Sequence, residues 1–287
     1  MSAATGYARL RQLVRERGAL HEATLELTYR CNLACEYCYN DKRARGKPLS
    51  LAQYLALLRD LAAMNVLYLT FTGGEPLLHP DLFALGRAAV ELGFVTRLRT
   101  NGHLLAGELV ERLRREVDPY LVDISLHGAT AATHDRQTRV PGSFARLVDN
   151  VEGLVRAGQR TQLVCTPTVW NQDELPAMLD LADRLGVRLR FQGPVVPRDD
   201  GDLSPLALNP SAEVWDALQA ELRRRDAALV PLGARQPQFR EPVISVEGEG
   251  QCSVGSEEVV VDPFGNVLPC LHVRWPAGNL HEQAIAE

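Results

Sequence analysis

The chain has 287 residues, of which 46% are hydrophobic and 23% are charged, a composition typical of a soluble globular protein with a large core. Its formal net charge of −5 does not indicate a protein that binds nucleic acids. No apolar run approaches the ~18 residues of a membrane span, and the first residues lack the basic and apolar regions of a signal peptide. We therefore expect a cytoplasmic protein with reduced cysteines and no nucleic-acid or membrane partner.

Up to residue 205, segments with the periodicity of β-strands alternate with segments that have the periodicity of helices. A charged stretch at 6–18 has Leu10, Leu13 and Val14 at helical spacing, which predicts a short helix packing on the rest of the fold. Short apolar or alternating runs then predict strands at 24–29, 66–71, 95–100, 121–126, 162–169 and 187–191. Amphipathic segments predict helices between them, at 51–64 with Ser50 as N-cap, 82–92, 105–117, 144–157 and 175–185. This alternation predicts right-handed parallel βαβ units, with ligands at the carboxyl ends of the strands.

A different pattern follows residue 197. It predicts, in order, a helix at 210–225 begun by Asn209, a Pro-rich connector at 231–242, and a hairpin at 257–268 with its turn at Pro263 and Gly265. We therefore divide the chain into an N-terminal helical segment (1–22), a barrel-like domain (23–205) and a C-terminal region (206–287).

Three cysteines, Cys31, Cys35 and Cys38, fall in the loop after the first predicted strand, where their thiols can converge. Thiolates bind zinc or iron–sulfur clusters. Three thiolates leave one iron of a four-iron cluster without a protein ligand, so that iron can bind a substrate or cofactor. A structural zinc takes four closed ligands, and no fourth Cys or His lies close in the sequence. A disulfide fits poorly with a reducing location.

This CxxxCxxC stretch, with Tyr37 just before the third cysteine, resembles the signature of the radical S-adenosylmethionine (SAM) superfamily. Three later stretches also resemble motifs of that family: Phe71-Thr72-Gly73-Gly74-Glu75-Pro76, Thr100-Asn101-Gly102 and Ser125-Leu126-His127-Gly128. The similarity covers residues 23–197. It implies an α/β fold, a partial (β/α)6 barrel open on one side, here with a small C-terminal extension of a β-hairpin and a helix.

The resemblance also implies roles for individual residues. Cys31, Cys35 and Cys38 would hold a [4Fe-4S] cluster, and SAM would chelate its open iron through amino and carboxylate groups. The residues implied to bind the cofactor are Tyr37, Gly73, Gly74, Glu75, Pro76, Asn101, Ser125 and Arg139. Without the cysteines, the Gly-Gly-Glu-Pro loop would be read as a tight turn, and Asn101 either binds the cofactor or caps its strand. His79, His127 and His134 are given no catalytic role, because a lone loop histidine is more often structural.

Three further cysteines lie outside this motif. Cys165, inside a predicted strand, is expected in the core. Cys252 and Cys270 flank the predicted hairpin, and that segment resembles the opening of a SPASM or Twitch domain, which holds auxiliary iron–sulfur clusters. Two thiols do not complete a four-cysteine site. We expect a vestigial or truncated auxiliary site; the alternatives are completion by His272 or a role for Cys270 as hydrogen donor to a substrate radical.

The family resemblance implies reductive cleavage of SAM to a 5′-deoxyadenosyl radical that abstracts hydrogen from a substrate. Ribosomally made peptides are frequent substrates in this family, so we expect a peptide that is crosslinked or oxidised. The expected partners are a reductant such as flavodoxin or ferredoxin and a separate leader-binding protein. The alternative enzyme is a dehydrogenase or epimerase of a small sugar or aminocyclitol. Outside enzymes, the alternatives are an iron–sulfur scaffold or electron carrier and, weakest, a structural zinc protein.

Overall fold

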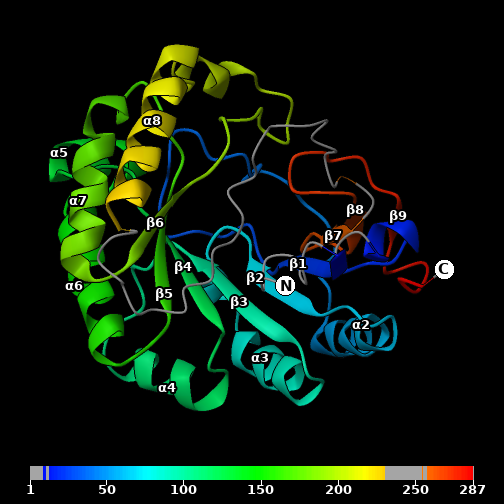
Figure 1. The fold of residues 1–287 in the computed structure, drawn as a ribbon. Helices are drawn as coiled ribbons and strands as arrows, with labels where there is room; N and C mark the ends of the chain where they lie inside the picture. Colours follow the sequence, from blue (N-terminus) through cyan, green and yellow to red (C-terminus); the bar gives the residue numbers. More distant parts are fainter. Residues whose placement is uncertain (1–8, 11–12, 230–253, 255–256, 287) are drawn as a thin grey trace.

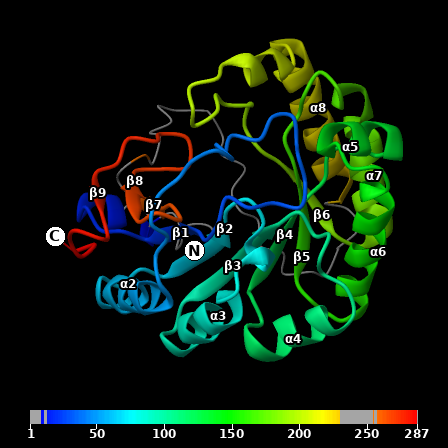
Figure 2. The ribbon, with the colours of Figure 1, turned by 180° about the vertical axis from the view of Figure 1, so that it is seen from behind.

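The structure is a computed structural model that describes residues 9–10, 13–229, 254 and 257–286. Its described strands form one curved sheet in the order β6-β5-β4-β3-β2-β1-β7-β8-β9. The helices cover the convex side, and the concave side faces the loops that follow the strands (Figures 1 and 2). The predicted open (β/α)6 barrel with a C-terminal hairpin and helix is confirmed.

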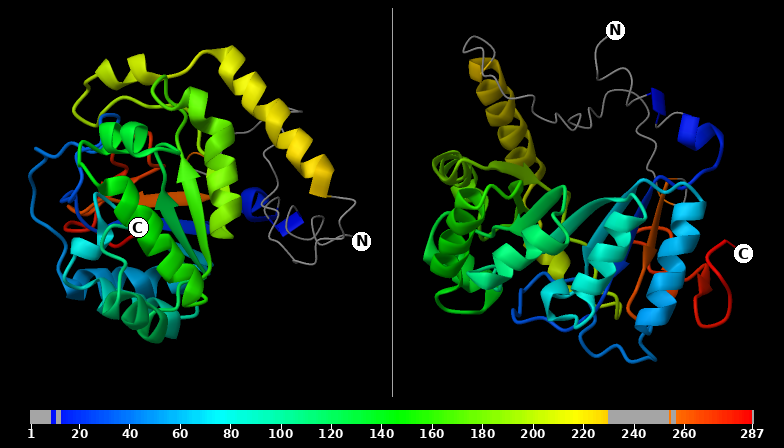
Figure 3. Two further views of the ribbon diagram at one scale, coloured as in Figure 1. Left: turned by 90° about the vertical axis from the view of Figure 1, so that its left-hand side faces the viewer. Right: turned by 90° about the horizontal axis from the view of Figure 1, so that it is seen from below.

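The strands of the barrel run parallel, each paired with its neighbour. Their bounds are β1 Glu22–Glu26, β2 Tyr68–Thr72, β3 Val95–Thr100, β4 Leu121–Ser125, β5 Thr161–Cys165 and β6 Arg188–Phe191. The C-terminal strands are β7 Glu258–Val261, β8 Asn266–Leu268 and β9 Gly278–Asn279. The predicted hairpin is β7–β8, with Gly265 at φ 83° in its turn. Its first strand also pairs in parallel with β1, so the hairpin extends the barrel sheet (Figure 3).

The described helices are α2 Leu51–Ala63, α3 Leu82–Glu91, α4 Glu108–Glu116, α5 Ala131–Thr138, α6 Ser143–Arg156, α7 Leu175–Leu185 and α8 Ala212–Leu229. Short 3-10 turns occur at η1 Pro76–Leu78, η2 Gln172–Glu174 and η3 Ser204–Leu208. Ser50 is the N-cap of α2, as predicted, and it also forms a capping box with Gln53. None of the described helices combines the length and apolar run that a bilayer crossing requires.

Alternate residues of each strand face the two sides of the sheet. Leu25, Phe71, Leu98 and Ile124 point to the helices and are buried in one core with Leu163. The opposite set of strand residues lines the concave face and is largely polar. The core therefore lies between sheet and helices, which leaves the concave side for polar chemistry.

Several predicted bounds are wrong at their ends. Helix α4 starts three residues late because residues 102–107 form turns, and β5 ends at Cys165 because Asn171 accepts a hydrogen bond from the Thr168 backbone N–H beyond it. Helix α8 starts at Ala212 rather than 210, since the Asn209 side chain instead exchanges two hydrogen bonds with the Val195 backbone. The connector at 231–242 lies outside the described residues.

The N-terminal segment is helical at residues 9–10 and 13–16. The leucines expected to pack on the barrel are exposed, Leu10 by 42% and Leu13 by 39%. Contact with the sheet is made by Arg15, which forms an ion pair with Glu257 just before β7. Helix α5, with Thr130 as N-cap, was not predicted because its sequence has little apolar periodicity.

Candidate functional site

The motif residues meet at one edge of the sheet. The loop carrying Cys31, Cys35 and Cys38 follows β1, and Gly73, Asn101 and Ser125 lie at the carboxyl ends of β2, β3 and β4. Since these strands are parallel neighbours, their ends lie side by side. The structure thus brings together the four stretches that resemble the family motifs.

The loop from residue 31 to residue 40, called the cysteine loop below, has no regular secondary structure and is held by its neighbours. Its Ala34 and Glu36 N–H groups donate to carbonyls at the end of α5, each at 3.1 Å. Arg198 donates to the Glu36 carbonyl at 2.8 Å, and the Asp199 N–H donates to the Tyr39 carbonyl at 2.9 Å. Segments that follow β4 and β6 therefore fix this loop, which itself follows β1 at the other end of the barrel.

The three thiols of the cysteine loop are free, as are those of Cys165 and Cys270. Burial raises the pKa of Cys31, Cys35 and Cys38, and that of Cys35 reaches about 12 because the charges of Cys38 and Cys31 add to the effect. Lys42, which donates to the Leu33 carbonyl at 3.0 Å, lowers all three pKa values by its charge. Thiols that resist ionisation alone but lie together beside a cation fit a metal centre that would stabilise their thiolates.

The sulfur of Cys31 accepts two N–H groups. The Leu33 backbone N–H lies 3.4 Å away, and the side-chain amide of Asn101 lies 3.7 Å away. Asn32 holds that amide at 2.7 Å. Asn101 therefore reaches across from the end of β3 to a predicted metal ligand, a contact that its sequence position alone did not reveal.

Gly73 and Gly74 lie against the chain that leads into the cysteine loop. Gly73 has φ 135°, and a Cβ there would lie 2.4 Å from the Thr28 carbonyl oxygen. A Cβ on Gly74 would lie 2.4 Å from the Arg30 carbonyl oxygen. The N–H of Gly74 donates to Thr28 at 2.6 Å, and that of Glu75 donates to Arg30 at 2.9 Å. The absence of side chains lets this turn pack directly against residues 28–30, which lead into the cysteine loop.

Glu75 is completely buried and its carboxylate is bonded within the chain. It accepts the Thr100 hydroxyl at 2.8 Å and the N–H groups of Asn101 and Leu77 at 2.9 and 3.1 Å. Burial raises the pKa of Glu75 to about 7, although these hydrogen bonds favour the charged form. Glu75 thus ties the ends of β2 and β3 together, and Pro76 behind it begins η1.

Three other residues implied to bind the cofactor, Tyr37, Ser125 and Arg139, differ in their burial and contacts. The Tyr37 hydroxyl lies 2.9 Å from Nδ1 of His127, whose pKa burial holds well below its usual range. Ser125 is half-buried at the end of β4. Arg139, in the left-handed region at φ 58°, forms an ion pair with Glu36 of the cysteine loop, and its side chain is 59% exposed. Tyr37 thus lies in the cysteine loop, Arg139 is paired with that loop, and Ser125 lies at the end of a strand of the same sheet.

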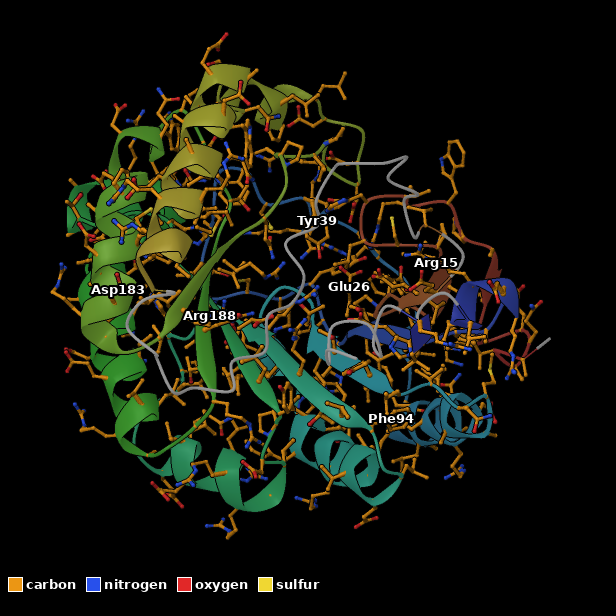
Figure 4. The ribbon with its side chains drawn as sticks, viewed as in Figure 1. Arg15, Glu26, Tyr39, Phe94, Asp183 and Arg188 are labelled. Carbon is orange, nitrogen blue, oxygen red and sulfur yellow. The ribbon has the colours of Figure 1, made fainter. Side chains whose placement is uncertain are left out.

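A buried ionic cluster that the sequence did not reveal connects the C-terminal region to this site. Glu26, at the end of β1, is fully buried and forms an ion pair with Arg274 at 2.8 Å. It also accepts the Tyr39 hydroxyl at 2.7 Å, and Arg274 contacts Asp199 at 3.3 Å. Figure 4 shows Glu26 and Tyr39 on the concave side of the sheet. No periodicity or motif marked Arg274, because its partners come from three distant segments.

The C-terminal cysteine site is described only in part. Cys270 is buried, and its sulfur accepts the His272 N–H at 3.3 Å. Cys252 lies outside the described residues. A cavity of about 200 Å³ is lined by His272, Leu271, Arg274 and residues 196–199 and 201. Cys165 is in the core, as predicted.

Among the described residues, no three His, Cys, Asp or Glu side chains are arranged around one point as ligands of a single metal ion. The three thiols of Cys31, Cys35 and Cys38 are instead of the type that binds an iron–sulfur cluster, which spans several irons. The charges of Cys31 and Cys38 raise the pKa of Cys35, and two N–H groups reach the Cys31 sulfur; both observations fit an iron–sulfur cluster.

Comparisons with known proteins agree with this geometry. The family model for the radical SAM superfamily matches residues 25–182. The AdoMet-dependent heme synthase of Methanosarcina barkeri is 30% identical over 279 residues, which cover 91% of this chain and 80% of the relative. The mycofactocin maturase MftC of Mycobacterium ulcerans is 34% identical over 273 residues, 90% of this chain and 70% of the relative.

Among solved structures, Streptococcus suis SuiB bound to S-adenosylmethionine has a TM-score of 0.71 at 17% identity, over 98% of this chain and 68% of SuiB. SuiB bound to its precursor peptide SuiA has a TM-score of 0.70. These likenesses show the fold, and the family match and the sequence relatives show the family. The chain belongs to the radical SAM superfamily, whose enzymes use a [4Fe-4S] cluster and SAM.

Proposed function

We propose that this enzyme modifies a ribosomally made peptide by hydrogen abstraction, through crosslinking or oxidation. The observation that carries the radical chemistry is the junction between the cysteine loop and the Gly73–Gly74 turn at the carboxyl ends of β1 and β2. The peptide substrate is supported by the likeness to a mycofactocin maturase and to a structure solved with a precursor peptide. A flavodoxin or ferredoxin would supply the electron, and a separate protein would bind the peptide's leader.

In this proposal Cys31, Cys35 and Cys38 hold the cluster. When bound, the cluster and SAM supply reductive cleavage of the sulfonium bond, which yields the 5′-deoxyadenosyl radical. The turn from Gly73 to Pro76 receives the SAM amino group. Because the Glu75 carboxylate is enclosed by its own partners, we assign that contact to backbone oxygens of the turn and give Glu75 the task of fixing it.

The remaining cofactor contacts are assigned by position. Tyr37 lies in the cysteine loop, Asn101 contacts that loop from the end of β3, and Ser125 ends β4; all three are proposed to line the SAM site. Arg139 remains a proposed partner of the SAM carboxylate, since its exposed guanidinium can exchange Glu36 for a ligand. The Tyr37–His127 contact would hold the tyrosine ring in place beside the cysteines.

The test uses anaerobically reconstituted protein with SAM and dithionite. We expect release of 5′-deoxyadenosine, and a higher rate when a peptide substrate is added. Mass spectrometry of that peptide should then show loss of hydrogen. Release of 5′-deoxyadenosine that is stimulated only by a sugar or aminocyclitol would reject the peptide and retain the radical chemistry. No release under any condition would reject both.

Asn101 offers a prediction about the electronic state of the cluster. Hydrogen bonds to a ligating sulfur favour the reduced, more negative state, so Asn101→Leu should lower the reduction potential. The measurement is an EPR-monitored redox titration without SAM. Asn150→Leu is the matched control, because Asn150 bonds the Gly102 and His103 carbonyls of the same turn. An equal shift in both variants would assign the effect to the turn.

Cys270 gives a second prediction. We propose a vestigial auxiliary site there, with Cys252 as its other thiol. Cys270→Ala should then leave uncoupled SAM cleavage within about twofold of the wild type, since the main cluster keeps its three ligands. If Cys270 is instead the hydrogen donor to a substrate radical, 5′-deoxyadenosine release would persist while peptide turnover disappears. Assaying both products of one reaction separates these outcomes.

A further inference from the structure

Asn40, the last residue of the cysteine loop, lies between a cysteine of that loop and the Gly73–Gly74 turn. Burial raises the pKa of Cys38, and the backbone N–H of Asn40, which donates to the Cys38 sulfur, opposes that rise. The side-chain amide of Asn40 donates to the Gly73 carbonyl at 3.2 Å. Asn40 is 4% exposed, so both contacts are made inside the protein. One residue thus connects a predicted cluster ligand to the turn that follows β2.

The Gly73 carbonyl points away from the chain that leads into the cysteine loop. The next N–H group, that of Gly74, donates to the Thr28 carbonyl at 2.6 Å. The described residues contain no cis peptide bonds, so the peptide unit between Gly73 and Gly74 is trans. In a trans unit the C=O and N–H groups point in opposite directions. The Gly73 carbonyl therefore faces the side opposite Thr28, where Asn40 holds it.

The side-chain amide of Asn40 is bonded on its nitrogen side. A backbone carbonyl can only accept, so the amide nitrogen must be the atom that faces Gly73. The amide oxygen is buried and has no hydrogen-bond partner among the described residues. Leaving such an acceptor without a donor costs about 1–3 kcal/mol. The side chain thus contributes through its N–H group, and an oxygen in the place of that nitrogen would face the Gly73 oxygen.

We infer that Asn40 positions the SAM amino group by holding the Gly73 carbonyl in the orientation that accepts it. A carbonyl oxygen accepts two hydrogen bonds, and Asn40 uses one of them. An ammonium group has donors only, and its charge-assisted bond to the second lone pair is strong when the carbonyl is already oriented. The inference rests on the proposed function, in which the turn from Gly73 to Pro76 receives that amino group. Asn40 acts through Gly73 and is a positioning residue.

SAM binding to the reconstituted protein without reductant tests the inference, with equilibrium dialysis as the measurement. Asn40→Leu keeps the approximate size of the side chain and removes its donor. We expect SAM to bind about tenfold more weakly, a typical loss for one charge-assisted hydrogen bond. A SAM analogue with hydrogen in place of the amino group should bind the variant and the wild type within about twofold. Unchanged SAM affinity, or an equal loss for both compounds, would overturn the inference.

Asn40→Asp tests which end of the amide acts, and it is the second variant should Asn40→Leu fail to retain iron. It keeps the shape of the side chain and places an oxygen against the Gly73 carbonyl. Loss of the donor should weaken SAM binding in this variant also. If the Asn40 oxygen contacted the amino group directly, the added negative charge would instead maintain or tighten binding. SAM affinity equal to or above that of the wild type would therefore overturn the inference.

Gln159→Met is the matched control. Gln159 is also 4% exposed, donates to the Pro119 carbonyl at 3.0 Å, and has a buried oxygen without a partner among the described residues. It lies just before β5, at the opposite end of the strands from the cysteine loop. SAM affinity should stay within about twofold of the wild type, and a loss equal to that of Asn40→Leu would overturn the inference. A wild-type protein that binds no SAM would reject the proposed function as well, so the two failures are distinguishable.

Discussion

Cys35→Ala is expected to abolish SAM cleavage, with release of 5′-deoxyadenosine falling to the level measured without enzyme. The cysteine loop supplies three thiols, and a four-iron cluster that keeps one iron open needs all of them. Cys35 has its pKa raised to about 12 by burial and by the other two thiols, so it is the thiol most dependent on a metal to ionise. Iron and sulfide content should fall together with activity.

Cys165→Ala provides the matched control for that result. Cys165 is also a buried free thiol with a raised pKa, but it ends β5 in the core and contacts Asn171. Its removal should leave iron content and SAM cleavage close to those of the wild type. Retained cleavage in Cys35→Ala, or equal loss in both variants, would contradict the assignment of the cluster to the cysteine loop.

Arg274→Met is expected to destabilise the fold by about 3–5 kcal/mol, because it leaves Glu26 buried without its cation. Burial already raises the pKa of Glu26, and Arg274 opposes that rise. In the variant the folded-state pKa rises further above that of the unfolded chain, so the loss of stability grows as the pH rises through the range above the unfolded pKa. Urea unfolding at acidic and neutral pH measures both effects.

The double variant Glu26→Gln with Arg274→Met checks the physical cause. It removes the buried charge together with its partner, so it should recover a large part of the stability lost in Arg274→Met. Its stability should also depend less on pH. A loss below 1 kcal/mol in Arg274→Met, or a double variant less stable than the single one, would contradict the role given to this pair.

Much of the barrel could be predicted from the sequence because its information is local. Apolar periodicity located every barrel strand, and the bounds of β3 and α7 were predicted to the residue. The cysteine spacing and the Gly73–Gly74 turn pointed to one site because parallel strands place their carboxyl ends together. The capping box of α2 is likewise a short-range signal.

What the sequence did not reveal depends on contacts between distant segments. The pairing of β7 with β1 connects residues more than two hundred positions apart, and the hairpin motif alone gave no partner for its outer edge. The role of Arg274 depends on its ion pairs with Glu26 and Asp199, which lie far from it in the sequence. Helix α5 is stabilised by its cap and by the cysteine loop rather than by an apolar stripe, so its periodicity was too weak to predict.

The most direct test of the central claim is EPR spectroscopy of the reduced, reconstituted protein with and without SAM, alongside iron and sulfide analysis. A four-iron cluster on Cys31, Cys35 and Cys38 with an open iron predicts about four irons per chain and a spectrum that changes when SAM is added. About eight irons per chain would indicate that an auxiliary cluster is bound as well, and would agree with the same claim. Zinc in place of iron, or a cluster spectrum that does not change when SAM is added, would contradict the central claim.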